Sequence, residues 1–568
     1  MTVRNCALMA ALALLGLNPA AAQEGAGARQ ETPPPAELGS PPIMISLADA
    51  VQMGLKNNLD IKVSRYNPRI REQDIYFQEA QFDPNLGIGA EHDDISQATL
   101  NRTDISNSKG EVYSIGFFDR LHWGANYSAS LNLQNSSSTS IFAPFPTTYF
   151  ASLNLAYNQS LLRGFGDQAN ETQIVIARNN RQIGDIQFRQ QVLDVLQRVE
   201  DAYWELVFTR QDLDVKKESL GLAQELLKLN KIRVQVGTLP PIEITQAEAE
   251  VASREQGVIV AENFVSDAED LLRKVLNMPK DEDAWVRPIA PTDQPTFIER
   301  PVELAKELGE AIASRPDLQQ SRLLIKNADT TLALRKNQLK WDLSGRATYS
   351  LQGLSGDVEQ QIGDITIPTS CNDGGADGIP GTGDLGDGDG ICQPFEPPGS
   401  LTVNNVPLQP TSALQNQDYF DAIDQLRDRD FASWTVGVFL NIPIGNNAAE
   451  ATYISSRLAK EQEDIRYESL RLNAEVAVRT AARAILTGKK RIAAAAKNVE
   501  LQRKKVEAEQ KKFENGMSTS FQVLTFQEDL TTGLGQQNRA MVDYRKSLTA
   551  LELAKGTLDR YLNVKVQE

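Results

Sequence analysis

A long stretch without proline limits the fold more than any other feature of this sequence. Residues 167–236 contain no proline and only two glycines. Within them an apolar residue recurs at every seventh position: Val199, Leu206, Leu213, Leu220, Leu227 and Val234. Sustained seven-residue spacing indicates a helix pair in a left-handed supercoil, whereas an ordinary amphipathic helix against a core is the alternative. A helix of about 70 residues is roughly 105 Å long, which does not fit a compact domain.

The long helix belongs to a pattern that occurs twice. The segment from Leu47 aligns with the segment from Leu304 at an offset of 257, and Gly237 aligns with Gly516 at an offset of 279. The growth of the offset, 22 residues, equals the length of the segment from Cys371 to Cys392. The simplest interpretation is one insertion in the second copy.

Each copy is predicted to have the order helix, strands, very long helix, turn, very long helix. We assign the first structural repeat to residues 46–290 and the second to residues 300–564. The first helix is expected over residues 46–81, starting after Ser46.

The strand segments alternate between apolar and polar residues. From residue 149 one face is mainly apolar and the other mainly polar: Tyr149, Ala151, Leu153, Leu155 and Tyr157 against Ser152, Asn154, Ala156 and Asn158. The segments from Leu343 and Trp434 follow the same rule. This pattern is typical of a transmembrane β-barrel, and a soluble sandwich with one buried face is the alternative. A further hairpin is expected over residues 112–134, inside or outside the barrel.

The few strand pairs of one chain cannot close a barrel, because lipid tolerates no open sheet edge. Several copies must therefore contribute strands. The expected fold is a mixed α/β membrane protein, with long α-helical coiled-coil hairpins and a transmembrane antiparallel β-barrel assembled from several chains.

The composition argues against several other classes. Asp and Glu outnumber Lys and Arg by 75 to 58, so a nucleic-acid partner is not expected. Two histidines and three cysteines make a histidine-based triad or a multi-ligand zinc site improbable. No nucleotide-binding or nucleophile motif stands in a suitable context, so we expect no enzyme and no catalytic residue.

The N-terminus has the features of an export signal. Arg4 precedes an apolar run that ends at Leu17, and three alanines follow before Gln23. We predict a cleaved signal peptide over residues 1–22, because this run is too short to span a membrane as an anchor. Residues 23–45 are rich in Ala, Gly and Pro and are predicted to form a disordered leader.

Several local sequences, in this order along the chain, carry a resemblance to a known family. They are LADAVQMGLKNNLDI, SLLRGFG, FLNIPIGN and the paired glycine turns near 237 and 516. From Leu47 to Leu562 the sequence resembles the outer membrane efflux proteins of the TolC type. The resemblance implies a homotrimer in the cell outer membrane with a twelve-stranded barrel, four strands from each protomer. It also implies an α-helical tunnel that extends into the periplasm.

The resemblance also implies a function. The chain would be a passive exit duct of a tripartite efflux or type I secretion system, exporting small molecules or proteins. An inner-membrane pump would drive export through a periplasmic adaptor protein. The alternatives are a non-conducting, periplasm-spanning structural coiled coil and a soluble coiled-coil adaptor.

The turns between the long helices are the candidate docking sites for the adaptor. The residues are Gly237, Thr238, Leu239, Pro240, Gly516, Met517, Ser518 and Thr519. Ordinary turn chemistry also explains glycine and hydroxyl residues at such positions. Family members often narrow the mouth with aspartates six and nine residues after the second glycine. Those positions are Gln522 and Thr525, so further candidates for the constriction are Glu243, Glu528 and Asp529.

A glycine- and aspartate-rich segment lies between two predicted strands. Residues 371–392 begin and end with a cysteine, and a disulfide between Cys371 and Cys392 is expected in an exported chain. Carboxylates in and just after the segment are candidate calcium ligands, with a flexible acidic loop as the alternative: Asp384, Asp387, Asp389 and Glu396. The segment belongs to a long loop over residues 354–430 that is expected to face outside the cell. Apart from this possible calcium, no cofactor is expected.

Overall fold

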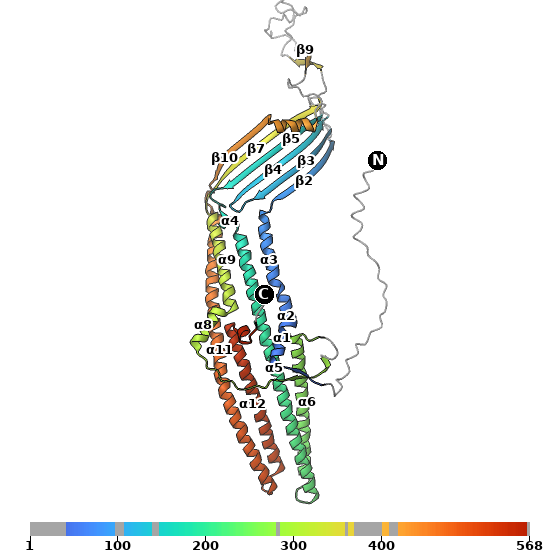
Figure 1. Cartoon of the computed structure of the whole chain (residues 1–568), viewed down its shortest axis with the longest axis vertical. Coiled ribbons are helices and arrows are strands. Elements are labelled where there is room, and N and C mark those ends of the chain that lie inside the picture. The colour runs from blue at the N-terminus through green and yellow to red at the C-terminus, as the bar shows by residue number, and fades with distance from the viewer. Residues whose placement is uncertain are drawn as a thin grey trace, which may run out of the picture.

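The structure is a computed structural model that describes residues 41–96, 107–138, 147–279, 285–357, 362–368, 400–407 and 418–564. Along its longest axis the molecule has a six-stranded β-sheet toward one end and long helices in the middle (Figure 1). At the other end lie the two turns that connect one long helix to the next (Figure 1). The predicted signal peptide, the predicted disulfide and the four candidate calcium ligands lie outside the described residues.

The first half of the chain begins with three consecutive helices. They are α1 (Leu47–Asn57), α2 (Leu59–Ser64) and α3 (Tyr66–Glu79). Ser46 and Asp49 form the capping box of α1. The single helix expected over 46–81 is broken at Asn58, whose backbone is extended and whose side chain accepts hydrogen bonds from the start of α2. Its amide also donates to the Val275 carbonyl at 2.8 Å, which anchors the break.

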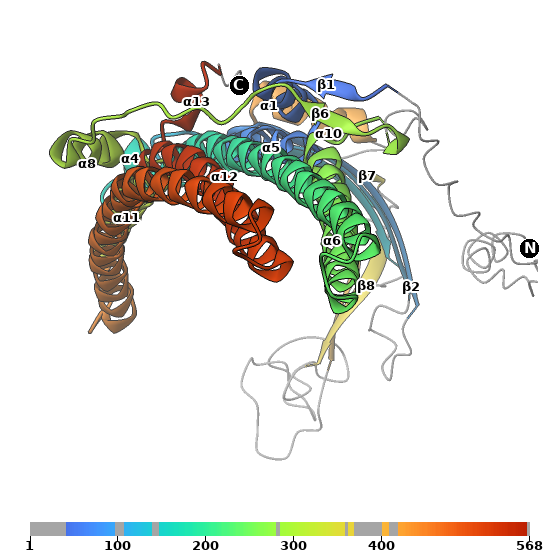
Figure 2. The ribbon, with the colours of Figure 1, turned by 90° about the horizontal axis from the view of Figure 1, so that it is seen from below.

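Two helical hairpins form the lower part of the molecule. Helix α5 (Thr172–Gln235) packs against α6 (Ile242–Leu276), and α11 (Asn447–Glu514) packs against α12 (Ser520–Lys555). Helix α12 also packs against α5, so the two hairpins stand side by side. Viewed from below, these helices form one curved layer (Figure 2). The shorter helices of the second half are α8 (Leu304–Ser314), α9 (Pro316–Gln338) and α13 (Leu558–Tyr561).

The sheet contains six antiparallel strands in the order β10-β7-β5-β4-β3-β2. Their bounds are β2 (Asn85–Ser96), β3 (Asn107–Arg120), β4 (Ala125–Ser138), β5 (Thr147–Ser160), β7 (Asp342–Asp357) and β10 (Phe431–Asn441). The resemblance implied four barrel strands per chain, whereas the sheet of this chain contains six strands. The first half contributes four strands and the second half two, so a single insertion does not account for the difference between the repeats.

The hairpin expected over 112–134 is part of this sheet, as β3 and β4. Strand β2 was not expected from the sequence. Gly87 and Gly89 occupy the face opposite Leu86 and Ile88, and His92, Asp93 and Asp94 follow. Such a composition is typical of a loop, and only pairing with β3 makes it a strand.

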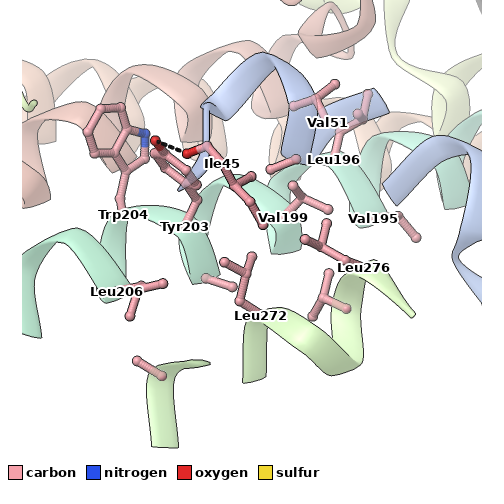
Figure 3. Close-up of a cluster of buried hydrophobic side chains, with 14 of the residues drawn as sticks. Ile45, Val51, Val195, Leu196, Val199, Tyr203, Trp204, Leu206, Leu272 and Leu276 are labelled. Atoms are coloured by element: carbon pink, nitrogen blue, oxygen red, sulfur yellow. Dashed lines mark hydrogen bonds between the residues drawn. The ribbon is translucent and has the colours of Figure 1, made fainter. Parts of the chain in front are cut away.

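The main hydrophobic core lies where α1, α5 and α6 meet (Figure 3). Val199, Leu272 and Leu276 are buried there. The Tyr203 hydroxyl lies 2.7 Å from the Asp293 carboxylate and 3.2 Å from the Ile45 carbonyl oxygen. The segment around Ile45 and the segment around Asp293, which connects the two repeats, therefore both pack against α5 in this core.

Two predicted boundaries need correction. The leader predicted over 23–45 ends too late, because β1 (Ile43–Ile45) pairs in parallel with β6 (Ile289–Pro291) and Ile45 is buried. The loop predicted over 354–430 is too wide. Strand β7 continues to Asp357, and α10 (Tyr419–Asp428) packs on β7 and β5. A separate hairpin lies between them, made of β8 (Ile362–Pro368) and β9 (Ser400–Pro407).

Candidate functional site

One face of the six-stranded sheet is apolar on every strand. The strand register places the following residues on this face: Leu86, Ile88, Tyr113, Ile115, Phe117, Ala129, Leu131, Leu153, Leu155, Leu343, Ala347, Tyr349, Trp434, Val436 and Val438. Several of them are exposed in the single chain, with Ile88 at 77% and Trp434 at 74%. An exposed apolar band of this kind needs a non-aqueous environment. Near one end α10 covers part of the band with Ala422 and Leu426.

The opposite face carries mainly neutral polar side chains. Asn126, Ser130 and Asn132 of β4 lie next to Ser152, Asn154 and Asn158 of β5. The Ser350 hydroxyl donates to Asn154 Oδ1 at 2.6 Å, and Arg346 donates to Asn158 Oδ1 at 2.8 Å. This face therefore suits contact with water.

The two outermost strands of the sheet, β2 and β10, each pair with a neighbour on one side only among the described strands. Every residue of β2 is exposed, and so is every residue of β10 except one. Such long exposed edges offer unpaired backbone groups to another strand.

Four of the six strands are joined to helices at the same end of the sheet. Helix α3 leads through η1 (Ala80–Phe82) into β2, and β5 leads through α4 (Asp167–Asn170) into α5. In the second half α9 leads into β7, and β10 leads into α11. Neighbouring helices pack in the same order as these strands, namely α11, α9, α5, α3. The sheet and the helices thus form one continuous wall (Figure 1).

At the opposite end each helical hairpin turns at a glycine in the left-handed region. Gly237 has φ +77°, and the next amide, of Thr238, donates to the Arg233 carbonyl at 2.8 Å. Gly516 has φ +74°, and the Met517 amide donates to Lys512 at 2.9 Å. This geometry closes the end of a helix, as the sequence predicted for both turns.

The predicted docking residues are largely exposed at these turns. Gly237, Thr238, Pro240, Gly516, Met517 and Thr519 are exposed, with Met517 at 70%. Leu239 and Ser518 are half-buried, and the Ser518 hydroxyl donates to Glu509 at 2.6 Å. The turns therefore present a surface that another protein can reach.

Contacts between the two turns hold the hairpins together. The Arg233 guanidinium lies over the Phe513 ring, 4.5 Å from its centroid, and donates to the Phe513 carbonyl at 3.3 Å. Ser520 forms a hydrogen bond with Glu243 across the same gap. Thus Glu243, a candidate for the constriction, is a contact between hairpins in this structure.

A buried arginine reinforces this junction. Arg254 of α6 donates to the Ser219 carbonyl of α5 and to the Leu524 carbonyl of α12, each at 3.0 Å. It also pairs with Glu250 at 2.9 Å. Arg254 was not predicted as a functional residue, because nothing in the sequence around it distinguishes it from arginines that are exposed to solvent.

Three candidates for the constriction lie together, and two lie apart. Thr525, Glu528 and Asp529 line a groove of about 460 Å³ between α6 and α12. Asp529 pairs with Lys505 at 2.9 Å. Gln522 stands at the start of α12, where its amide donates to the Thr519 hydroxyl, and Glu243 belongs to the contact described above.

The described residues contain no cluster of three or more His, Cys, Asp or Glu side chains placed to hold a metal. Within the same residues no helix combines the length and the apolar character needed to cross a bilayer.

Comparison with known proteins gives a consistent result. The family profile described as outer membrane efflux protein matches residues 124–278 and 407–557, more than half of the chain. None of the curated proteins matches the chain at a significant level.

Solved structures of outer membrane channels have a similar fold. The CmeC channel of Campylobacter jejuni matches with a TM-score of 0.60 and 15% identity, over 90% of this chain and 86% of CmeC. VceC of Vibrio cholerae matches with a TM-score of 0.58 and 13% identity, over 90% of this chain and 96% of VceC. The open state of Neisseria gonorrhoeae MtrE matches with a TM-score of 0.57 and 16% identity, over 90% of this chain and 89% of MtrE.

Proposed function

Because the chain belongs to the outer membrane efflux protein family, we propose that it is the exit duct of a tripartite efflux or type I secretion system. Three copies form a homotrimer in the outer membrane, and an inner-membrane pump drives export through a periplasmic adaptor. The duct is passive and catalyses no reaction. The observation that carries this proposal is the continuous wall of sheet and helices with one apolar and one polar face.

The edges of the sheet explain why several copies are needed. In lipid an unpaired strand edge is costly, because no water satisfies its backbone groups. Pairing of β2 of one copy with β10 of the next removes both edges at once. The apolar face with Ile88 and Trp434 then meets lipid, and the polar face with Asn154 and Arg346 lines the lumen.

The helical turns at the far end are the proposed contact with the adaptor. The turn from α5 to α6, with Gly237, and the turn from α11 to α12, with Gly516, form the end of the molecule farthest from the six-stranded sheet (Figure 1). The groove with Thr525, Glu528 and Asp529 lies just above them, and we assign the periplasmic constriction to this region. Contact with the adaptor separates α12 from α6 by breaking the contacts of Arg254 and Glu243.

Electron microscopy of the detergent-extracted protein, with its mass measured in the same preparation, tests this proposal. A three-fold tube with a detergent belt at one end is expected, and ion conductance in a planar bilayer should follow. A water-soluble monomer without a detergent belt would overturn the membrane duct. A three-fold tube that never conducts, even with its turns separated by mutation, would favour the structural coiled coil instead.

A further inference from the structure

We propose that the β3–β4 hairpin is part of the pore wall and that three copies close a barrel of eighteen strands, six from each copy. The inference rests on the trimeric duct proposed above. It departs from the twelve-stranded barrel that the family resemblance implied, and it makes the outer part of this duct wider.

The hairpin lies in the middle of the sheet rather than at its edge. Strand β3 pairs with β2 from Asn107 to Phe118, and β4 pairs with β5 from Ala125 to Ser137. If the hairpin left the wall, β2 and β5 could pair with each other, but β3 and β4 would lose the rows of backbone hydrogen bonds that they form with β2 and β5. A hairpin lying outside a four-stranded wall is therefore disfavoured.

The turn between β3 and β4 is built into the junction of sheet and helices. The Gly166 amide, just before α4, donates to the Trp123 carbonyl at 3.0 Å. His122 lies 2.8 Å from the Glu171 carboxylate and stacks on Phe82 of η1 at 4.1 Å. The turn thus contacts the connections of β2 and of β5 to their helices, which fixes the hairpin between these two strands.

Both faces of the wall continue through the hairpin. Ile115 and Leu131 stand in the apolar row between Ile88 and Leu153. Ser130 of β4 stands beside Asn154 of β5 on the polar face. A segment outside the barrel would not need this two-sided pattern in register with its neighbours.

The widths of the two layers also agree. Six strands about 4.8 Å apart, tilted by about 40°, cover an arc of about 38 Å, whereas four strands cover about 25 Å. The four helices joined to the sheet cover about 32–40 Å at 8–10 Å between axes. Six strands therefore match the arc of the helices below them without a step in the wall.

The strand number sets the size of the opening. By the same spacing and tilt, eighteen strands give a backbone radius of about 18 Å, and twelve give about 12 Å. The barrel of this duct would therefore limit the size of the cargo less than a twelve-stranded barrel does.

Labelling of single cysteines in proteoliposomes tests whether the hairpin lines the pore. In β4, Ser130→Cys is expected to react with a water-soluble maleimide at the rate of Asn154→Cys in β5. The matched variants on the apolar face, Ala129→Cys and Leu155→Cys, should not react, and the unsubstituted protein measures the background from native cysteines. Labelling of Asn154→Cys without Ser130→Cys, or equal labelling of Ser130→Cys and Ala129→Cys, would overturn the inference.

Electron microscopy of the trimer gives a second, independent measurement. Eighteen strands are expected in the unmodified protein, and a trimer with twelve would refute the inference while leaving the proposed duct intact. Loss of the trimer and of the detergent belt would instead refute the duct itself. A variant lacking residues 107–138 can still pair β2 with β5, because these strands are antiparallel, and its barrel should be narrower by about 12 Å in diameter. If this variant fails to fold, the strand count of the unmodified trimer decides.

Discussion

Replacing Glu200 with glutamine should make the protein more stable above pH 7 and leave its stability unchanged below pH 4.5. Glu200 lies on α5 with a side chain that is only 3% exposed, and the Thr549 hydroxyl donates to it. The pKa of its carboxyl is raised from 4.5 to about 7. Burial raises this pKa most, the positive charge of Arg545 lowers it, and the negative charge of Asp201 raises it. The folded protein thus binds this proton more tightly than the unfolded chain does.

The sign and size of the effect follow from this shift. The contribution of Glu200 to stability is complete below pH 4.5 and is lost as the pH rises through 7. A shift of this size corresponds to about 3 kcal/mol at 1.36 kcal/mol per pKa unit. Glutamine keeps the shape and never ionises, so Glu200→Gln should gain up to about 3 kcal/mol at pH 8.

Urea unfolding at pH 4, 6 and 8, followed by tryptophan fluorescence, measures this difference. The matched control is Glu205→Gln, five residues further along α5. Burial acts to raise the pKa of Glu205, but Lys546 and Arg539 outweigh it and lower the pKa. This control should therefore lose stability at pH 8 rather than gain it. Equal pH slopes in the wild type and Glu200→Gln would refute the reasoning.

Three other predictions concern the helical turns and the junction. Arg254→Met removes the hydrogen bonds from α6 to the Ser219 and Leu524 carbonyls and leaves Glu250 without its partner, so we expect a loss of about 3 kcal/mol and higher resting conductance in planar bilayers; an unchanged conductance would contradict its role in holding the hairpins. Gly516→Ala places a side chain at φ +74° with open space around it, so its cost in thermal unfolding should be about 1 kcal/mol. Gly124→Ala should cost clearly more than Gly516→Ala, because its Cβ would lie 2.2 Å from the Gly164 carbonyl oxygen; similar melting temperatures for the two variants would disprove this packing.

The sequence predicted those elements whose pattern is strong along the chain itself. The heptad spacing from Val199 predicts α5, and the glycines at 237 and 516 predict the two turns. Alternation predicts β5, β7 and β10, because the apolar face must repeat every second residue. These signals are local, so one sequence is enough to see them.

Other features depend on contacts that a single sequence does not show. Strand β2 has too many glycine and acidic residues to be recognised, and its partner β3 supplies the pairing that makes it a strand. The break at Asn58 needs the Val275 carbonyl, which is 217 residues away. The hydrogen bonds of Arg254 connect α6 with α5 and α12. No regular spacing in the sequence identifies an arginine with such contacts.

The neutral polar face of the sheet has a consequence for how a cargo would travel. In the proposed duct the central lining of β4 and β5 consists of side chains such as Ser130, Asn132, Ser152 and Asn154. These groups exchange hydrogen bonds with water easily and hold neither sign of charge. A solute that passes along these two strands would therefore meet uncharged hydrogen-bonding groups, and the charged group beside them would be Arg346 of β7, which donates to Asn158.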